Sequence, residues 1–407
     1  MSLLSNLDLG YMFQGIGTMF ATEPKIAFAR VFLIILGIIL LYLGTTGVLE
    51  GLIMIPMGLG MSTVNAAVLF MEGGRLGNII VDPNVSDPFA LIDILQINFL
   101  QPIYSLTFSN ALIACFVFMG IGVLSDISYL VAKPFSSMTL AICAELGTVL
   151  TFPIAVAMGL SFGQAAAVSL VGGADGPMVI YASLMLAKEY FVPITIVAYL
   201  YLSLCYAGYP YMVKLLIPKS LRGIKMDLSV FPDIKPGEKI AFAVAMCAIL
   251  SLLFPSAAPL FLSFFLGVCL RESGISAYTE LLEKVVLYSA TLFLGLILGV
   301  LTEANTILDP VVFKILILGV TALFISGLGG IIGGYIMYFA TGGKYNPVIG
   351  IAAVSCVPTC AKVAQKIAMD ANKQAFILPY AMGGNVCGVI TTAILTGAYI
   401  SVVPLLQ

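Results

Sequence analysis

Long apolar runs separated by short polar stretches fill the chain from Val31 to the C-terminus. Several runs extend about 20 residues without a charge, the length that an α-helix needs to cross about 30 Å of hydrocarbon. They do not alternate between apolar and polar residues as the strands of a barrel do. The pattern therefore predicts membrane helices in the ranges 27–48, 51–71, 100–124, 136–160, 164–187, 190–217, 240–270, 282–302, 310–340, 346–361 and 376–403.

Two polar connections differ in charge. The stretch 72–98 is acidic, and we assign it no role. The stretch 218–239 collects lysines and arginines, so the positive-inside rule predicts that it lies on the cytoplasmic face. The ranges 240–270 and 310–340 each fit one long helix or two short ones, which leaves the helix count open.

An internal duplication is suggested by two similar motifs. GGADGP at 172–177 has a counterpart, GGKYNP, at 342–347. Because each motif begins an apolar segment interrupted by glycine and proline, we expect broken helices at 171–183 and 342–361. Interrupted segments at corresponding positions in two halves are typical of repeat-built transporters, whose ion site lies near the midplane. Glycine pairs are common in membrane helices, so coincidence is the alternative.

The duplication gives the expected organisation of the chain. Residues 1–26 lack the features of a cleavable signal peptide, so we expect them to stay in the mature chain and lie along the membrane interface. A first membrane repeat at 27–217, a basic cytoplasmic loop at 218–239 and a second membrane repeat at 240–407 follow. The predicted fold is an all-α polytopic membrane protein, a transporter-like helical bundle with two broken helices.

Composition agrees with the membrane class. The chain of 407 residues is 61% hydrophobic and 9% charged, with a mean hydropathy of +1.11, whereas soluble domains carry about a quarter charged residues. A net charge of −2 argues against nucleic acid as a partner. The chain has no histidine, so it lacks the usual general base and the usual zinc ligand. Its eight cysteines are scattered, and we interpret the pair Cys356 and Cys360 as packing residues.

Asp175 is the carboxylate that the first interruption places at membrane depth. Burying an ionised carboxylate at the centre of a membrane helix costs about 2.5–3.5 kcal/mol, so a cation or a proton is its expected partner. The neighbouring Gly173, Gly176 and Pro177 interrupt the helical hydrogen bonds and free carbonyl oxygens. Irregular backbone at this depth is tolerated only where it is buried in protein or lines a wet cavity. The motif therefore predicts a cation site.

The second half of the chain offers more oxygen atoms. Asn346, Ser355 and Asn385 each lie near glycine or proline in an apolar segment. Oxygen ligands around one carboxylate suit a hard cation, and sodium fits better than a transition metal because histidine is absent. The alternative for each of these residues is hydrogen bonding between helices.

Three further residues have two interpretations each. Glu145 is either a second site carboxylate or a structural partner. Tyr201 either hydrogen-bonds into the Asp175 cavity or is an ordinary interfacial tyrosine. Lys362 follows the second broken segment, where it either meets an anionic group that enters from the cytoplasm or extends its ammonium group to the membrane surface.

Four blocks carry a resemblance to a known family: GGADGP, YLYLSL, KYNPVIGIAAVS with VPTCAK, and GGNVCGVI. In these blocks and their order, residues 27–407 resemble the β subunit of the sodium-translocating, biotin-dependent decarboxylases. The family includes the enzymes for oxaloacetate, methylmalonyl-CoA, glutaconyl-CoA and malonate. The resemblance implies that this subunit removes CO₂ from carboxybiotin and exports sodium, while the acid itself is decarboxylated on an α subunit.

The resemblance also implies roles for individual residues. By position, the residues implied to couple or coordinate sodium are Asp175, Asn346, Gly350, Ser355 and Asn385. Catalytic roles are implied for Asp175, Tyr201 and Lys362. Contact with carboxybiotin is implied for Lys362 and Asn346. Family members often have arginine at the position of Lys362. Lysine keeps the charge but loses the two-point grip of a guanidinium group.

The implied partners are a carboxyltransferase α subunit, a biotin carrier subunit and a small single-span γ or δ anchor subunit. The resemblance further implies a fold of two inverted repeats and a β homotrimer surrounded by lipid in the bacterial cytoplasmic (inner) membrane. The chain contains no Ala-Met-Lys-Met block, so we expect biotin to be carried by a partner and not to be covalently bound here.

As a mechanism, we expect carboxybiotin to dock near Lys362 while sodium occupies the cavity around Asp175. A proton that enters through Asp175 or Tyr201 would displace the sodium, and rocking of one repeat against the other would open the site outward. An acyl-CoA, glutaconyl-CoA or methylmalonyl-CoA, is favoured as the acid, with oxaloacetate as the other choice. The alternative function is a self-contained, sodium-coupled carboxylate transporter. A membrane anchor without chemistry would explain neither Asp175 nor the paired interruptions.

Overall fold

The computed structural model describes residues 13–71, 75–83, 85, 88–229 and 233–406. The fold divides into two compact units. Unit 1 comprises Met1–Leu112 and Thr291–Phe313, and unit 2 comprises Ile113–Ala290 and Lys314–Gln407. All the predicted site residues belong to unit 2. The predicted division into two membrane repeats stays a prediction, and residues 1–12 of the expected interfacial segment lie outside the described residues.

Unit 1 is mainly helical. Its elements are α2 (Gln14–Ala21), α3 (Pro24–Thr45), α4 (Gly51–Ala66), the short antiparallel strands β1 (Leu69–Phe70) and β2 (Leu76–Gly77), α5 (Pro88–Ile97), α6 (Gln101–Ile103), η2 (Tyr104–Phe108) and α19 (Ala304–Ile307). The sequence predicted a helix over 51–71, and this end point is wrong because α4 ends at Ala66 and a strand follows.

The buried Arg30 fastens the segments of unit 1 to one another. Its Nε donates to the carbonyl of Asn65 at 2.9 Å and its guanidinium reaches Thr18 Oγ1 at 3.2 Å. The Asn65 side chain in turn donates to the carbonyl of Thr302 at 2.8 Å. Neutral oxygens thus satisfy a buried guanidinium, which would otherwise be costly to desolvate.

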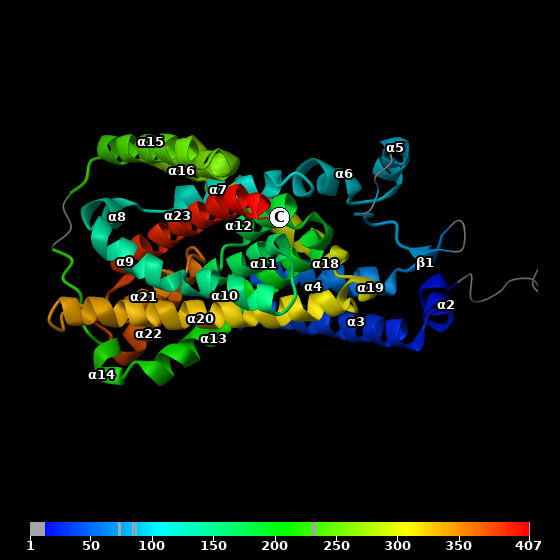
Figure 1. The fold of residues 1–407 in the computed structure, drawn as a ribbon, viewed down its shortest axis with the longest axis horizontal. Coiled ribbons are helices and arrows are strands. Elements are labelled where there is room, and N and C mark those ends of the chain that lie inside the picture. Colours follow the sequence, from blue (N-terminus) through cyan, green and yellow to red (C-terminus); the bar gives the residue numbers. More distant parts are fainter. Residues whose placement is uncertain (1–12, 72–74, 84, 86–87, 230–232, 407) are drawn as a thin grey trace, which may run out of the picture. The chain divides into compact units, whose positions relative to one another are not determined.

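Unit 2 holds most of the helices (Figure 1). They are α7 (Leu112–Leu124), which starts at the unit boundary, α8 (Ser128–Ala132), α9 (Pro134–Ala144), α10 (Leu146–Ala157), α11 (Phe162–Ser169), η3 (Leu170–Gly173), α12 (Gly176–Leu186), η4 (Lys188–Tyr190), α13 (Phe191–Leu216), α14 (Lys219–Arg222), α15 (Pro236–Leu253), η5 (Pro255–Ala257), α16 (Ala258–Glu272), α17 (Ser276–Glu280), η6 (Leu281–Val286), α21 (Ile349–Ala352), α22 (Thr359–Ala371), α23 (Leu378–Val402) and η7 (Val403–Leu405). The helices α18 (Leu287–Leu301) and α20 (Pro310–Ala340) each contribute to both units.

The two long apolar ranges, 240–270 and 310–340, fold differently. The range 240–270 forms two helices, α15 and α16, because the chain leaves helical geometry at Phe254 and restarts at Pro255. Proline cannot donate the backbone hydrogen bond that a continuous helix needs at this point. The range 310–340 instead forms the single helix α20 of 31 residues.

The described residues contain six helices that are long and apolar enough to cross a membrane, or up to eight spans if each of two bent helix pairs counts as one. The six are Pro24–Thr45, Pro134–Ala157, Pro236–Leu253, Ser276–Leu301, Pro310–Ala340 and Leu378–Leu405. Large apolar side chains such as Phe28, Leu252 and Phe313 are exposed on them, as expected for surfaces that face lipid. The prediction of an all-α polytopic membrane protein is confirmed.

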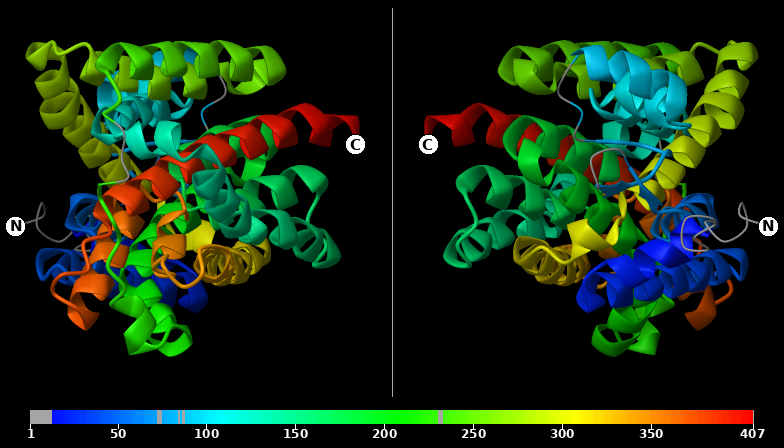
Figure 2. Two further views of the ribbon diagram at one scale, coloured as in Figure 1. Left: turned by 90° about the vertical axis from the view of Figure 1, so that its left-hand side faces the viewer. Right: turned by 90° about the vertical axis from the view of Figure 1, so that its right-hand side faces the viewer.

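The continuous helix α23 is the scaffold of unit 2 (red in Figures 1 and 2). It contacts α8, α9, α12, α21 and α22, and most of its side chains are buried. A helix buried on nearly every side serves as a fixed core against which shorter segments pack. Both interrupted segments of this unit lie against it.

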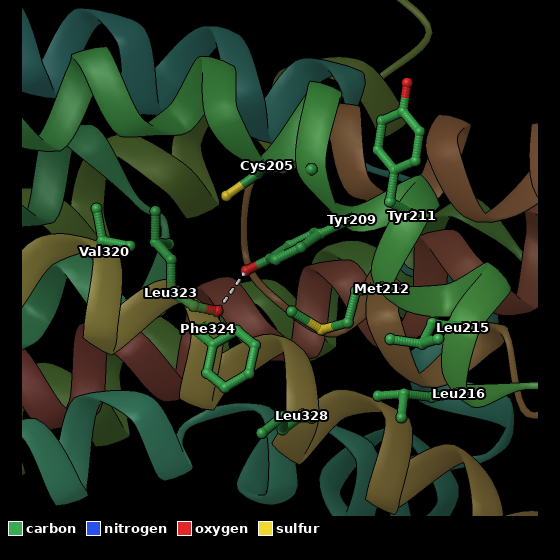
Figure 3. Close-up of a pocket in the computed structure, with 11 residues that line it drawn as sticks. Cys205, Tyr209, Tyr211, Met212, Leu215, Leu216, Val320, Leu323, Phe324 and Leu328 are labelled. Carbon is green, nitrogen blue, oxygen red and sulfur yellow. Dashed lines mark hydrogen bonds between the residues drawn. The ribbon is translucent and has the colours of Figure 1, made fainter.

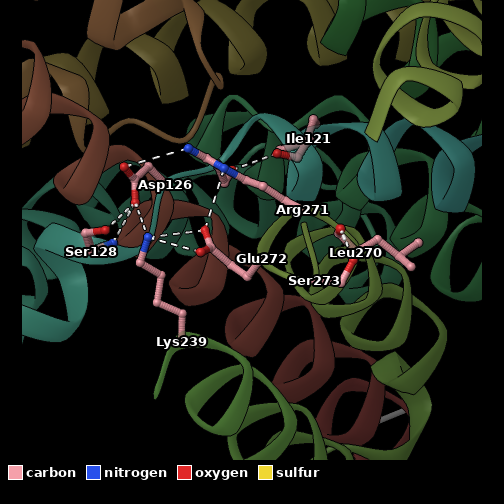
Figure 4. Close-up of polar contacts among 9 residues, drawn as sticks. Ile121, Asp126, Ser128, Lys239, Leu270, Arg271, Glu272 and Ser273 are labelled. Carbon is pink, nitrogen blue, oxygen red and sulfur yellow. Dashed lines mark hydrogen bonds and ion pairs between the residues drawn. The ribbon is translucent and has the colours of Figure 1, made fainter. Parts of the chain in front are cut away.

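An ion-pair cluster ties the α15 and α16 hairpin to the loop after α7 (Figure 4). Lys239 Nζ lies 3.1 Å from Glu272 and 3.6 Å from Asp126, and Arg271 lies 3.7 Å from Asp126. Burial opposes ionisation of Asp126, but hydrogen bonds from Ser128 and the charges of Arg271 and Lys239 outweigh it and lower the pKa of this carboxyl group. Because Asp126 is 47% exposed, solvent screening keeps the stabilisation small.

Candidate functional site

The first interruption lies between Gly173 and Gly176. The helix α11 tightens into the 3₁₀ turn η3, and Ala174 then adopts a left-handed conformation with φ 55°. This conformation costs a residue other than glycine about 1–2 kcal/mol. Asp175 caps the next helix, α12, through an Oδ1 that accepts a hydrogen bond from Met178 N at 3.3 Å. The break predicted within 171–183 is therefore a change of helix at Asp175.

The second interruption lies at 353–358, between α21 and α22. The predicted segment 342–361 contains it, but the motif GGKYNP at its start forms the turn after α20 and not the break itself. Ser355, inside the break, donates to the carbonyl of Gly173 from its backbone N at 3.0 Å and also from its Oγ. The two interruptions therefore meet at Gly173 and Ser355.

Three buried oxygen atoms near this meeting point have no hydrogen-bond partner. They are Asp175 Oδ2, Asn385 Oδ1 and the hydroxyl of Tyr199. Asp175 is 3% exposed and Asn385 is fully buried. The side-chain nitrogen of Asn385 donates to the carbonyls of Ala352 and Val354 at 2.7 and 2.9 Å, which holds the amide beside the second interruption.

Tyr199 covers the start of α12. A Cβ at Gly176 would lie 2.2 Å from the ring carbon of Tyr199 that carries the hydroxyl, so only glycine allows this contact. The Tyr199 side chain is near enough to the Asp175 carboxylate to feel its negative charge. Leaving a buried polar atom without a partner costs about 1–3 kcal/mol, and more if it is charged. Three such oxygens near one meeting point therefore suit a ligand that accepts oxygen lone pairs, namely a cation.

Glu145 is a second buried carboxylate beside this site. It lies between α9 and α10, is 4% exposed, and accepts hydrogen bonds from Thr148 Oγ1 at 2.6 Å and from Thr392 Oγ1. The Thr392 hydroxyl also lies 3.1 Å from Ser355 Oγ. Among the residues that the structure describes, no lysine or arginine forms an ion pair with Glu145 or Asp175.

Asp175, Ser355 and Asn385 are thus brought together by the two interruptions, whereas the other predicted site residues have contacts elsewhere. The hydroxyl of Tyr201 donates to the carbonyl of Leu316 at 2.9 Å. The side-chain nitrogen of Asn346 donates to the carbonyls of two residues in the basic stretch 218–239, Arg222 at 2.9 Å and Ile224 at 2.8 Å. The roles predicted for Tyr201 and Asn346 stay predictions.

Gly350 and Lys362 differ in burial. A Cβ at Gly350 would lie 1.9 Å from the carbonyl oxygen of Gly330, so this glycine allows α21 to approach α20. Lys362, in the first turn of α22, is exposed. It helps to line a groove of about 390 Å³ whose members are Lys362, Gln365, Lys366, Met369, Asp370, Lys373 and Leu378.

A larger pocket lies between α13 and α20 (Figure 3). It has a volume of about 450 Å³, and aliphatic and aromatic side chains such as Leu323 and Phe324 form most of its lining. The hydroxyl of Tyr209 is satisfied by the carbonyl of Leu323 at 3.1 Å. The lining is therefore mostly apolar, which suits neither a carboxylate nor a cation.

The sequence did not identify Tyr199 or Thr392 as site residues. Tyr199 stands two positions before Tyr201 in one helix, and residues two apart point about 200° apart around a helix axis. The motif YLY therefore contains both candidates, but it does not show which ring faces Asp175. No sequence feature marks Thr392, because the hydroxyl of a threonine in an apolar helix usually bonds to a carbonyl of the same helix. Thr392 also makes this contact, with the carbonyl of Gly388 at 3.0 Å.

Apolar spans, two meeting interruptions and buried oxygens without partners define an ion-transporting membrane protein built on discontinuous helices. A sequence model of the Na⁺-transporting oxaloacetate decarboxylase β subunit matches residues 29–403, and the chain belongs to this family. It is a multi-pass membrane β subunit of a sodium-pumping decarboxylase.

Relatives along nearly the whole chain support this assignment. The chain is 54% identical over 396 residues to a carboxybiotin decarboxylase from Malonomonas rubra, and this alignment covers 97% of the chain and 98% of that protein. It is 32% identical over 429 residues to the oxaloacetate decarboxylase β chain of Haemophilus ducreyi, covering 95% and 96% of the two chains. It is also 32% identical over 370 residues to the methylmalonyl-CoA decarboxylase β subunit of Veillonella parvula, covering 91% and 92%.

Proposed function

We propose that this chain decarboxylates carboxybiotin presented by a partner subunit and exports Na⁺ through the site at Asp175. The observation that carries the proposal is the pair of buried, unpartnered oxygens, Asp175 Oδ2 and Asn385 Oδ1, beside two interrupted helical segments. Sodium is bound by oxygen atoms, and the broken helices of transporters supply such atoms at membrane depth. The relative named carboxybiotin decarboxylase, 54% identical, supports the chemistry.

For the sodium site we propose Asp175, Asn385 and Ser355 as ligands, with the Gly173 carbonyl as a backbone ligand. Ser355 already contacts Gly173 through two hydrogen bonds, so a cation that binds this carbonyl replaces the hydroxyl proton of Ser355. Asn346 remains a proposed ligand of the same cation in another conformation. A rearrangement that carries Asn346 to the site must break its hydrogen bonds to Arg222 and Ile224.

For carboxybiotin we propose the exposed groove at the start of α22. Three of its members are lysines and only Asp370 is acidic, so the groove favours an anion. Lys362 stands four residues after the second interruption, which ends at 358. Binding of the carboxylate at Lys362 therefore acts on the segment that also carries Ser355.

The reaction requires a proton. The bond between the carboxyl carbon and the biotin nitrogen breaks, CO₂ leaves, and the nitrogen takes up one proton. We propose that a proton replaces sodium at Asp175, because one carboxylate needs only one positive partner. Exporting one positive charge against 100 mV requires about 2.3 kcal/mol, so decarboxylation must change the affinity of the site for sodium.

The family implies that other subunits complete the enzyme. We propose an α carboxyltransferase, a biotin carrier, a small single-span anchor and a β homotrimer in the bacterial cytoplasmic membrane. The acid is decarboxylated on the α subunit, and we keep glutaconyl-CoA, methylmalonyl-CoA and oxaloacetate as candidates. Identities of 32% to both an oxaloacetate and a methylmalonyl-CoA relative do not separate these two acids. Avidin-sensitive CO₂ release from each acid by the purified complex identifies the substrate.

Replacing the central carboxylate tests the proposal. In the reconstituted complex, we expect Asp175→Asn to reduce sodium-dependent decarboxylation of carboxybiotin and ²²Na⁺ uptake at least 100-fold, because the amide keeps the shape but carries no charge. The control is Asp93→Asn, which changes an exposed aspartate in α5. Full sodium-dependent activity in Asp175→Asn would refute the assignment of the site.

A further inference from the structure

The strongest unassigned feature of unit 2 is the second buried carboxylate. Glu145 is as deeply buried as Asp175, and the two carboxylates are near enough for their charges to repel each other. An isolated buried charge costs several kcal/mol unless something neutralises it. Since the described residues supply no basic partner to either group, the pair needs positive charge from outside the protein.

The surroundings of Glu145 contain hydroxyl groups and one further titratable side chain. Thr148 from α10 and Thr392 from α23 donate to its two oxygens. The phenol of Tyr399, also in α23, is near enough to feel the charge of Glu145, and its hydroxyl donates to the carbonyl of Thr148 at 3.3 Å. Two hydroxyl donors offset part of the desolvation of a carboxylate but do not neutralise its charge.

A chain of hydroxyl groups connects Glu145 to the meeting point of the two interruptions. It runs from Glu145 Oε1 through Thr392 Oγ1 and Ser355 Oγ to the carbonyl of Gly173. Every side chain in it is at most 4% exposed. The contacts join residues 247 and 182 positions apart in the sequence, so the chain crosses from α9 and α10 to α23 and then to both interruptions.

The direction of the hydroxyl protons depends on Glu145. A hydroxyl has one proton to donate and two lone pairs that accept. The Thr392 hydroxyl has two acceptors within reach, Glu145 and the carbonyl of Gly388. While Glu145 is ionised, its charge directs the single Thr392 proton at the carboxylate, and the Thr392 oxygen is free to accept from Ser355. The Ser355 proton can then turn away from Gly173, which leaves that carbonyl able to bind a cation.

We propose that Glu145 is a positioning residue of the sodium site, which raises the affinity for sodium through its charge and through the hydroxyl groups of Thr392 and Ser355. This inference rests on the proposed function, because it assigns a second carboxylate to the cation site at Asp175. Sodium contacts the proposed ligands, while Glu145 acts through Thr392.

The test is the sodium concentration that gives half-maximal decarboxylation of carboxybiotin by the reconstituted complex, together with ²²Na⁺ binding to the same complex. We expect Glu145→Gln to raise this concentration about ten-fold or more, which corresponds to about 1.4 kcal/mol. Thr392→Val, which removes the connecting hydroxyl, raises it about three-fold, and Thr392→Ser restores the wild-type value. A merely structural role would lower thermal stability without this specific change in sodium affinity.

The matched control is Thr396→Val, one turn further along α23. Thr396 is fully buried like Thr392, but its hydroxyl donates to the carbonyl of Thr392 at 2.8 Å and not to Glu145. Its replacement leaves the half-maximal sodium concentration within about two-fold of the wild type, less than the effect expected of Thr392→Val.

Two results would overturn the inference. One is a folded Glu145→Gln complex with the wild-type sodium affinity. The other is an unchanged sodium affinity in Thr392→Val, which decides the matter if Glu145→Gln does not fold. Failure of the proposed function gives a different result, since the wild-type complex would then show no sodium dependence or Asp175→Asn would stay active.

Discussion

At the scale of single residues, Asp175 combines a structural and a chemical role. Its Oδ1 caps α12, where the positive end of the helix dipole stabilises a negative charge by about 0.3–1 kcal/mol. Its Oδ2 has no partner and is buried. The helix terminus thus fixes the side chain, while one oxygen is left for a ligand.

Tyr199 and Tyr201 provide a prediction at this scale. We expect Tyr199→Phe to raise the half-maximal sodium concentration about three-fold or more without loss of stability, because its hydroxyl has no partner and faces the Asp175 site. Tyr201→Phe removes a hydrogen bond to Leu316 and costs about 1 kcal/mol of stability. Sodium titrations and thermal melts of both variants measure these effects. A larger effect on sodium from Tyr201→Phe than from Tyr199→Phe would favour the tyrosine assigned by resemblance.

At the scale of elements, the two interruptions depend on close approach of backbones. The second interrupted segment packs against α20, where a Cβ at Gly350 would lie 1.9 Å from the carbonyl oxygen of Gly330. Relieving this clash would require the backbone of α20 or α21 to move, and with it a whole helix. The short helix α21 therefore sets the position of Ser355, which follows it by three residues.

This packing predicts opposite outcomes for two glycine substitutions. We expect Gly350→Ala to destabilise the protein by about 3 kcal/mol or more and to abolish sodium transport, because overpacking displaces the second interruption. Gly384→Ala is the matched control, since its Cβ would meet Leu140 at 3.5 Å and Ala353 at 3.9 Å, which is ordinary contact. Alanine at this helical position gains about 0.5–1 kcal/mol. Thermal unfolding in detergent compares the two, and equal stabilities would contradict the packing argument.

At the scale of the whole molecule, the question is which steps the chain performs without partner subunits. The chain carries a candidate ion site and an exposed basic groove, but the family to which it belongs works as one subunit of a decarboxylase. The sequence left open a self-contained, sodium-coupled carboxylate transporter. Such a transporter would use the same broken helices and the same ligands. The two functions therefore differ in one testable respect, because only the decarboxylase subunit needs a partner subunit for sodium transport.

Reconstitution separates these two functions. We expect the chain alone in proteoliposomes to take up no ²²Na⁺ in response to a carboxylate gradient. Addition of the biotinylated partner subunits and their acid starts uptake, and avidin stops it, because the energy comes from carboxybiotin. Uptake by the chain alone, insensitive to avidin, would establish the secondary transporter instead.

The sequence by itself determined the membrane class and the interruption at Asp175, whereas the site residues that the resemblance assigned stay predictions. These features are local: apolar length fixes a membrane span, and glycine with proline next to a carboxylate marks a break. The same local rules failed for GGKYNP, which forms a turn before the second break at 353–358.

Only the tertiary structure decided which side chains share the site. The sequence left the role of Glu145 open and did not identify Thr392 or Tyr199, because the link from Glu145 to Thr392 spans 247 residues and helix rotation selects Tyr199 over Tyr201 at Asp175. In apolar helices most faces are equally hydrophobic, so periodicity does not show which face is turned inward. Packing around α23 makes that choice, and with it the neighbours of the buried carboxylates.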